Sequence, residues 1–259
     1  MATPNAKYTD PAAKLVRLPI EDLSDGRRND GAWGLQGEPA WKKSGVRDGQ
    51  LSVFYGKDSG TSGDPGVGGM AFTAIPRGLP SREATMTFKV LFEPGWHFSK
   101  GGKVGGFFVG HGEASGYQHS PTGSSHRLMW QRGGGAIAYI YPPSGLAQKD
   151  PALQPEGHGI GYFKDLFPEG TLKVGTWNTV TLGIRINSFR ADGTPRADGV
   201  ATLRINGMLG VKDDIRWSRS SDLIVSQFRF NTFFGGPDPA VCDCRARYRD
   251  FAFAPVLAA

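Results

Sequence analysis

Cysteine is scarce in this chain of 259 residues, which contains only Cys242 and Cys244, one residue apart. A disulfide between such close neighbours would be strained, and a lone Cys-x-Cys falls short of the four ligands that a structural zinc site needs. We therefore expect two free thiols, or a turn at the end of a strand. The pair gives little information about the redox compartment.

Long apolar segments are also missing. No run approaches the roughly 18 residues that a membrane helix requires, so we expect no membrane partner. The first 25 residues lack the apolar core of a signal peptide. We expect that the protein does not use a standard secretory route, or that a leader has been removed.

Several catalytic motifs do not occur in the sequence. There is no Gly-x-Ser-x-Gly elbow, and the glycine-rich segment at 101–106 has neither the spacing of a phosphate loop nor the Ser/Thr that follows one. The histidines lack the HExxH spacing of zinc enzymes, so we expect no metal and no other cofactor. The five histidines are His97, His111, His119, His126 and His158.

Positive charge is in excess, with a formal net charge of +6 and a pI of about 9.4. A basic protein favours a polyanionic partner, either nucleic acid or an acidic polysaccharide. The chain has no concentrated Lys/Arg tract, no zinc-finger spacing and no RNA-binding aromatic signature, which argues against nucleic acid. Charge that serves solubility alone is the remaining alternative.

The pattern of apolar residues predicts an all-β protein. Segments that alternate with period two, or that are rich in β-formers, are separated by Gly, Pro, Asn and Asp, and no long segment has helical periodicity. We predict two antiparallel sheets packed as a sandwich, with one sheet curved into a groove. The predicted strands are 51–56, 69–75, 84–92, 103–110, 126–131, 136–141, 177–188, 199–206, 223–235 and 246–254.

The domain organisation follows from the same pattern. Residues 1–45 are weakly patterned, and we expect an N-terminal extension with a strand or two that packs on the sandwich or joins it. Residues 46–259 then form one β-domain without an interdomain linker. The stretch 142–176 is too long for a tight turn and is a candidate loop bordering a cleft.

A forty-residue block from Gly101 to Pro142 suggests a chemistry. Glycines 133–135 supply the positive φ angles of a turn between two strands. With the turn centred on Gly133, Arg127 faces Tyr139 and Ser125 faces Tyr141 on one side of a hairpin. The opposite side is apolar and also carries His126. The segments are GGKVGG at 101–106, SSHRLMW at 124–130 and AIAYIY at 136–141.

These residues could remove a proton beside a carboxylate, if Lys103 on the nearby segment joins the hairpin. The alternative is an ordinary edge hairpin with a polar outer face. Two other functions stay open. A glycosidase would need two carboxylates, for which Glu113, Asp165 and Glu169 are available. A non-catalytic carbohydrate-binding module could use tryptophans to stack on sugars. The candidate tryptophans are Trp96, Trp130, Trp177 and Trp217.

The order of these motifs resembles polysaccharide lyase family 14, which includes molluscan alginate lyases and glucuronate-cleaving lyases of chlorella viruses. The resemblance rests on GGK, then Ser-x-Arg, then Tyr-x-Tyr, and extends to FRFNTFFGG at 228–236. It implies a β-jelly-roll sandwich with a substrate cleft on the concave sheet. It implies cleavage of 4-linked uronic-acid polymers, of glucuronan or alginate type, by metal-independent β-elimination.

The resemblance also implies roles for particular residues. Lys103, Ser125, Arg127, Tyr139 and Tyr141 match the catalytic positions of the family. In this reading Arg127 and Lys103 offset the substrate carboxylate, and the tyrosines act as base and acid, with their pKa lowered by the neighbouring cations. We further expect a monomer, located outside the cell or on a virion, whose partner is an acidic polysaccharide. The expected substrate-binding residues are His119, His158 and Gln131.

Overall fold

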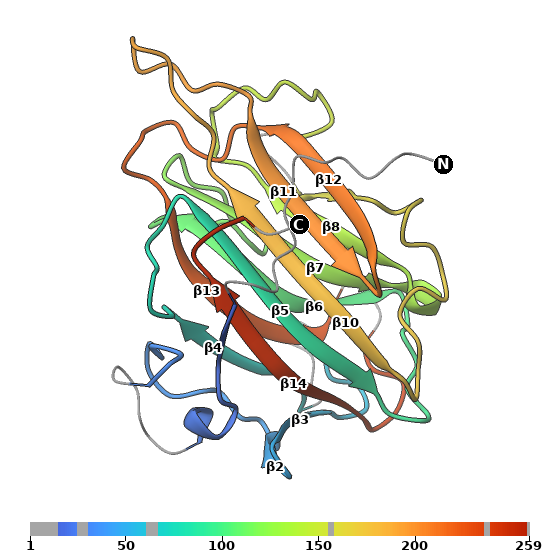
Figure 1. Ribbon diagram of the computed structural model, residues 1–259. Helices are drawn as coiled ribbons and strands as arrows, with labels where there is room; N and C mark the ends of the chain where they lie inside the picture. The colour runs from blue at the N-terminus through green and yellow to red at the C-terminus, as the bar shows by residue number, and fades with distance from the viewer. Residues whose placement is uncertain (1–14, 25–30, 61–66, 155–157, 236–238, 258–259) are drawn as a thin grey trace.

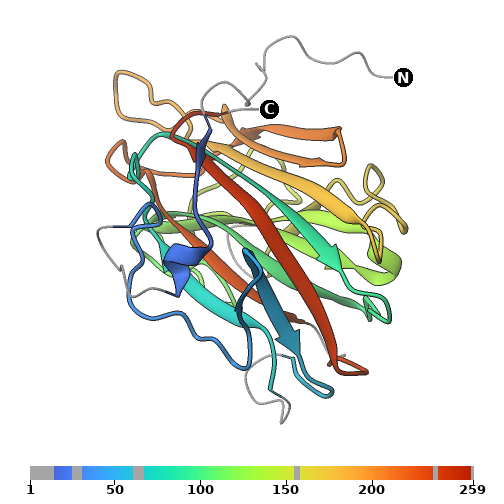
Figure 2. The ribbon, with the colours of Figure 1, turned by 60° about the horizontal axis from the view of Figure 1, so that its bottom comes forward.

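Two antiparallel sheets lie face to face and enclose the core (Figures 1 and 2). The structure is a computed structural model that describes residues 15–24, 31–60, 67–154, 158–235 and 239–257. The arrangement is the predicted jelly-roll β-sandwich. Helix is confined, within these residues, to two 3-10 turns, η2 (Glu21–Leu23) and η3 (Arg132–Gly134). None of the described helices has the length and apolar character needed to cross a membrane.

The first sheet has eight strands and forms the near layer in Figure 1. Its order is β12 (Met208–Ile215), β11 (Gly199–Ile205), β10 (Trp177–Arg185), β5 (Glu83–Phe92), β14 (Cys244–Ala254), β3 (Gln50–Tyr55) and β2 (Gly45–Arg47), with β1 (Val16–Arg17) paired to β14. The second sheet has six strands and lies behind it. Its order is β4 (Met70–Ala74), β13 (Val225–Phe234), β6 (Gly101–Gly110), β7 (Gly123–Gln131), β8 (Ala136–Tyr141) and β9 (Ile160–Tyr162).

The ten predicted strands are confirmed within a few residues at their ends. Alternation explains this success, as in β10, where Val180, Leu182 and Ile184 are fully buried between the sheets. Four strands lie outside the ten predicted ranges, and one of them, β1, falls in the N-terminal extension, where a strand or two were expected. Three of them, β1, β2 and β9, are only two or three residues long, and β12 combines glycine with the charged run KDD, which hides its period.

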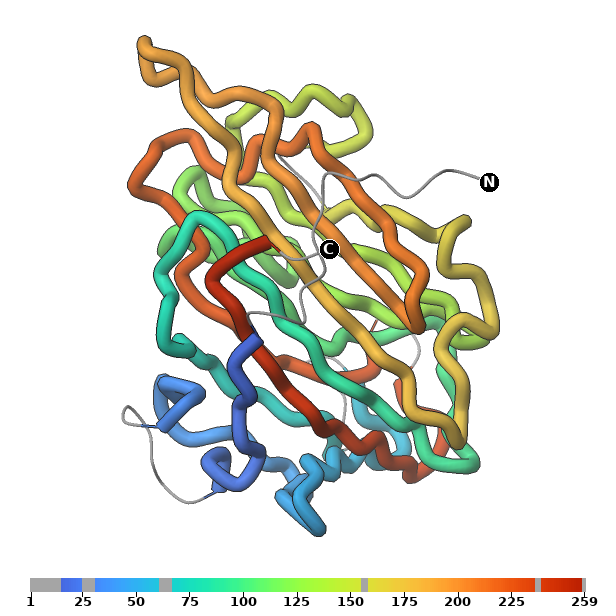
Figure 3. Tube along the Cα trace, viewed as in Figure 1, coloured from blue at the N-terminus to red at the C-terminus, as the bar shows by residue number. Residues whose placement is uncertain are grey.

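The N-terminal segment contributes to both pairing and packing. Strand β1 runs beside β14, as the dark blue and dark red tubes in Figure 3 show. Trp33 is fully buried, with its ring centroid 5.3 Å from Phe72 and 5.1 Å from Phe251. Its indole N–H donates to the carbonyl of Pro19 at 2.6 Å. The domain boundary near residue 45 stays a prediction, and residues 1–14 and 25–30 of the extension lie outside the described residues.

Most tryptophans are structural. Trp130 and Trp217 are buried to within 1% of full burial, and Trp96 is 6% exposed. Trp96 and Trp130 belong to an aromatic cluster with Tyr55 and Phe234, in which the ring centroids lie 4.9–6.2 Å apart. Of the four tryptophans considered for sugar stacking, only Trp177 is half-exposed.

Replacing Trp33 by Ala should lower the free energy of unfolding by about 3–5 kcal/mol, because it empties a fully buried site and leaves the Pro19 carbonyl without its donor. Chemical denaturation followed by far-ultraviolet circular dichroism would measure the loss, because that signal comes from the backbone and not from the tryptophan that is removed. The control is Val16→Ala, at a position that is 63% exposed. Equal stability of the two variants would show that the N-terminal segment does not support the sandwich.

Candidate active site

The hairpin of β7 and β8 has the predicted register. Arg127 is paired with Tyr139 and Ser125 with Tyr141. The turn runs through η3, where Gly133 and Gly134 have φ of +60° and +82°. These angles favour glycine, so the turn fixes which residues oppose each other and hence which face each side chain takes.

The inner face of the hairpin packs in the core. Leu128, Trp130, Ala136, Ala138 and Ile140 are all fully buried. His126 is buried with them, and its Nε2 lies 3.0 Å from the carbonyl oxygen of Thr202. Burial lowers the pKa of His126 to about 4, so this histidine is neutral and structural.

Lys103 joins the outer face of the hairpin through a β-bulge in β6. The register with β7 shifts between Lys103 and Gly105, and Lys103 is paired with Met129, which shares a face with Arg127. Gly105 has a φ of +141°, and a Cβ there would lie 2.6 Å from the carbonyl oxygen of Arg229. The glycines around Lys103 are therefore required by close packing, and this explains part of the GGKVGG segment.

Arg127 is a buried cation with no bonded partner in the part of the chain that the structure describes. Its side chain lies among three aromatic rings, with the guanidinium carbon 5.3 Å from the centroid of Tyr141, 5.7 Å from Tyr139 and 5.8 Å from Phe108. The residue is 5% exposed, and Nε and Nη2 have no hydrogen-bond partner among the described residues. Burial lowers its pKa to about 10. A buried charge without hydrogen bonds is costly, so this site favours an anionic ligand that can accept them.

Lys103, like Arg127, is a cation whose charged form is destabilised in this site. Its ammonium lies 5.5 Å from the ring centroids of both Tyr139 and Phe233. Burial and then the charge of Arg127 lower the pKa of Lys103 to about 8. The amine can therefore lose its proton in mildly alkaline solution, and a bound anion would stabilise its charged form.

The two tyrosines contact each other. Their ring centroids are 5.4 Å apart and nearly perpendicular. Burial, and then the interaction with the Tyr141 hydroxyl, raise the pKa of Tyr139 against the opposing effect of Arg127. The prediction that the cations lower the tyrosine pKa is therefore wrong for Tyr139, because loss of hydration outweighs the neighbouring charge.

Ser125 is placed differently from the other four. It lies on the predicted face, but it is fully buried and its hydroxyl donates to the carbonyl of Ala114 at 2.6 Å. This bond ties the segment after β6 to the hairpin. Its geometry suits a positioning residue better than one that touches substrate, and the catalytic role remains a prediction.

Two of the three expected substrate-binding residues lie near Tyr141. The His119 ring is 5.0 Å from the Tyr141 ring, and His158 packs on Tyr117 with ring centroids 4.4 Å apart. Gln131 stands at the end of β7, two alternating positions beyond Arg127 on the same face, and donates to the Trp130 carbonyl at 3.1 Å. The segment 142–176 reaches the site at His158, although 155–157 lie outside the described residues.

Sequence reasoning missed several residues around the tyrosines. Tyr117 is 71% exposed and donates its backbone N–H to the Tyr141 hydroxyl at 3.4 Å. Gly159 lies so close that a Cβ would come within 2.4 Å of the Tyr141 ring and 2.9 Å of the Tyr139 ring. Both residues are in loops without periodicity, so no sequence pattern places them here.

A second guanidinium lies beyond Phe108. The guanidinium carbon of Arg229 is 4.0 Å from the Phe108 ring, and its Nη1 contacts Glu113 Oε2 at 2.9 Å. Burial acts to raise the pKa of Glu113, but hydrogen bonds from Ser115 and Arg229 outweigh it and lower the pKa. Arg229 falls within the FRFNTFFGG segment, whose last residue, Gly236, lies outside the described residues.

The carboxylates considered for a glycosidase do not form a pair. Glu113 is bonded to Arg229, whereas Asp165 and Glu169 are exposed in the segment after β9. Glu169 lies beside Gly133, at the turn of the hairpin. Across the described part of the chain, no group of three His, Cys, Asp or Glu side chains is arranged to hold a metal ion.

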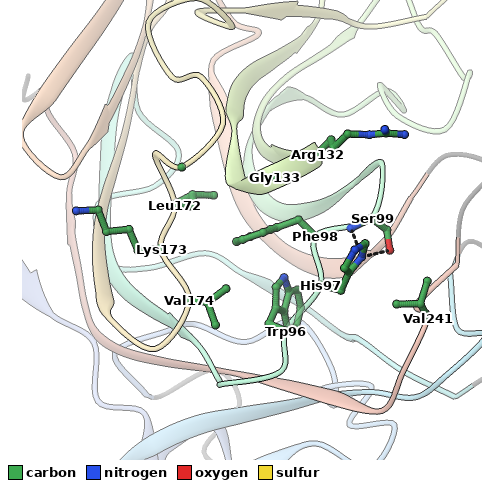
Figure 4. Close-up of a pocket in the computed structure, with 11 residues that line it drawn as sticks. Trp96, His97, Phe98, Ser99, Arg132, Gly133, Leu172, Lys173, Val174 and Val241 are labelled. Carbon is green, nitrogen blue, oxygen red and sulfur yellow. Dashed lines mark hydrogen bonds between the residues drawn. The ribbon is translucent and has the colours of Figure 1, made fainter.

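A separate hollow of about 690 Å³ lies at the end of the sandwich near the η3 turn (Figure 4). Trp96 and Phe98 project into it, and His97 is hydrogen-bonded to Ser99 at its rim. Its lining includes none of the five predicted catalytic residues. The five predicted residues therefore lie on the face of the six-stranded sheet and not in this hollow.

Comparisons with known proteins agree with this geometry. The profile of the family Polysaccharide lyase 14 matches residues 43–251. Exolysin of Paramecium bursaria Chlorella virus 1 is 28% identical over 195 residues, which is 66% of this chain and 29% of Exolysin, so the chain spans less than a third of that relative.

Two solved structures are similar over nearly their whole length. The alginate lyase vAL-1 from Chlorella virus is 45% identical, with a TM-score of 0.87 over 93% of this chain and 98% of its own. The marine PL-14 alginate lyase from Aplysia kurodai has the same coverage with a TM-score of 0.73, and at 18% identity it shows the shared fold.

In the free protein, the Lys103 amine should titrate near pH 8, and Arg127→Met should raise this pKa because it removes the adjacent positive charge. The measurement is a pH titration by NMR of protein with ¹³C-methylated lysines. The Lys103→Gln variant assigns the signal by its loss. A Lys103 signal that is unchanged by Arg127→Met would contradict the electrostatic coupling.

Proposed function

This chain belongs to polysaccharide lyase family 14, and from that membership we propose that it cleaves 4-linked uronic-acid polymers of the alginate or glucuronan type by metal-independent β-elimination. The observation that carries the proposal is the buried guanidinium of Arg127, which lacks a hydrogen-bond partner on two nitrogens beside Lys103 and the tyrosine pair. A sugar carboxylate is a planar anion that matches this guanidinium with two parallel hydrogen bonds.

The relatives support an acidic polysaccharide as the substrate. The protein with 45% identity is an alginate lyase, and the match extends over 93% of this chain. The net charge of +6 favours the approach of a polyanion. A location outside the cell or on a virion stays a prediction.

The reaction breaks the C5–H bond and the C4–O4 bond of one uronate. The C5 proton goes to a base, its electron pair forms the C4=C5 double bond, and the departing O4 takes a proton from an acid. Negative charge grows on the carboxylate as C5 loses its proton. Arg127 binds that carboxylate more strongly as its charge rises, which stabilises the transition state over the ground state.

The pKa directions support an assignment of the two proton transfers. Tyr139, with its raised pKa, stays protonated in mildly alkaline solution and is the proton donor to O4. Lys103, with a pKa of about 8, becomes a neutral amine in the same range and is the acceptor of the C5 proton. In the assignment favoured by sequence, Lys103 stays charged, and the two tyrosines share the roles of base and acid without a choice between them.

Incubation with polyuronates should produce the ultraviolet absorbance of the unsaturated sugar in the presence of chelator. The panel is glucuronan, polymannuronate, polyguluronate and a neutral glucan as control. Absorbance that rises on one of the acidic polymers would identify the substrate. Because chelator is present, it would also exclude an accessible essential metal. New reducing ends without absorbance would indicate a hydrolase, and binding without either would indicate a carbohydrate-binding module.

Lys103→Arg should reduce kcat/KM by about 10²–10⁴-fold, because arginine keeps the charge but does not release a proton at these pH values. In the unmodified enzyme kcat/KM should rise as pH passes through about 8, since the free amine forms above that value. The matched variant is Tyr139→Phe, which should lower the rate at every pH and keep that rise. A fully active Lys103→Arg variant would show that Lys103 is not the base and acts only as a fixed positive charge.

A further inference from the structure

A row of three arginines lies on the face of the molecule opposite the candidate active site. Arg245, Arg247 and Arg249 alternate along β14 with Ala246 and Tyr248, which are fully buried. The arginines therefore point outward from the eight-stranded sheet, about 7 Å apart along the strand. We call these three residues the outer arginine strip. In Figure 1, β14 belongs to the near layer and β7 and β8 to the far one.

Aromatic rings hold two of the guanidinium groups. Arg245 is paired in register with Phe54, and its guanidinium carbon lies 5.0 Å from that ring. The guanidinium carbon of Arg249 lies 4.1 Å from the ring of Trp177 on β10. A guanidinium stacked on a ring keeps its N–H edges directed to the side, where they can bind a carboxylate.

The strip carries more positive charge than its neighbours neutralise. Arg249 is paired in register with Lys89, and like charges opposed across two strands are destabilising. Two carboxylates contact these cations: Glu93 lies 2.5 Å from Arg247, and Asp250 lies 3.0 Å from Lys89 and 3.6 Å from Arg249. Arg245 contacts the hydroxyl of Ser52 at 3.4 Å. Counted over the residues that the structure describes, the four cations thus exceed the contacting carboxylates by two charges.

A bulge in β14 supplies one of these carboxylates. The register with β5 shifts between Arg249 and Ala252, and Asp250 has a φ of +55°. This conformation turns Asp250 to the same face as Arg249, where it partly offsets the repulsion between Arg249 and Lys89. The side chains stay accessible, with Arg247 47% and Arg249 36% exposed.

We propose that the outer arginine strip, with Phe54 and Trp177, is a second, non-catalytic binding site for an anionic polysaccharide chain. Its cations are spaced along one strand, and two of them are held over aromatic rings of neighbouring strands, an arrangement that complements a polymer with a carboxylate on each sugar. The choice of a polyuronate as ligand rests on the proposed function. The site is on the opposite face from Lys103 and Arg127, so it binds a segment that is not being cleaved.

Such a site would keep the enzyme on long polymers. When one segment is held by the strip, a second segment meets the active site at a raised local concentration. Short oligosaccharides cannot reach both faces of the sandwich. The strip should therefore influence cleavage of polymers and leave cleavage of short oligosaccharides unchanged.

The test compares Arg245→Gln/Arg249→Gln with Arg190→Gln/Arg196→Gln, a control that removes two exposed positive charges from the connection between β10 and β11. Binding is measured by electrophoretic retardation in gels containing polymannuronate or glucuronan, in a Tyr139→Phe background that slows cleavage. The strip variant should lose about tenfold in affinity and the control much less, since exposed charge pairs each contribute modestly. With Tyr139 intact, the strip variant should raise KM for polymer and leave kcat/KM on tetrasaccharide unchanged.

A second substitution, expected to increase binding, separates the proposal from simple loss of folding, because a misfolded variant would not bind more tightly. Asp250→Asn keeps a residue type that tolerates positive φ and removes one neutralising carboxylate, so retention by polyuronate should increase. Equal retention of the strip variant and its control would overturn the inference. Retention by RNA or anionic vesicles, but not by polyuronate, would overturn it as well. The proposed function is scored separately, by the absorbance released from polymer by the unmodified protein.

Discussion

The pairing of β7 with β8 is the constraint on which the candidate active site depends. One turn, with Gly133 and Gly134 at positive φ, sets a register that opposes Arg127 to Tyr139. Because side chains alternate, the same register that puts the polar set on the outer side of the six-stranded sheet places Trp130 and Leu128 in the core between the sheets. A slip of one residue would turn the charged set into that core and the apolar set away from it, so the stability of the sandwich itself maintains the site.

The polar face of the hairpin holds cations whose charge is poorly stabilised in the free protein. The guanidinium of Arg127 lies among aromatic rings, and the neighbouring Lys103 ammonium is partly desolvated. Glu113, whose charge acts on Arg127, is bonded to Arg229 and leaves Arg127 without a bonded carboxylate among the described residues. This arrangement costs stability in the free protein, and an anionic substrate offsets that cost when it binds.

The two outer faces of the sandwich both carry cations beside aromatic rings, but they differ in how far those cations are buried and how they are spaced. On the six-stranded sheet Arg127 is buried, Lys103 is half-buried and both lie beside aromatic rings, which suits chemistry on a single sugar. On the eight-stranded sheet they are exposed and spaced along β14, which suits weak contact with many charges of a polymer. Burial shifts the pKa of the first group, and solvent screens the charges of the second.

Sequence alone determined the strands with clear alternation, the hairpin register and the face of Ser125, Arg127, Tyr139 and Tyr141, because these follow from local period and turn chemistry. It did not determine β12 or the very short strands, whose pairing depends on partners distant in the chain. Burial decided the rest. The raised pKa of Tyr139, the lowered pKa of Lys103 and the contacts of Tyr117 and Gly159 with the tyrosines arise only when separate segments exclude water together, and no local pattern records that exclusion.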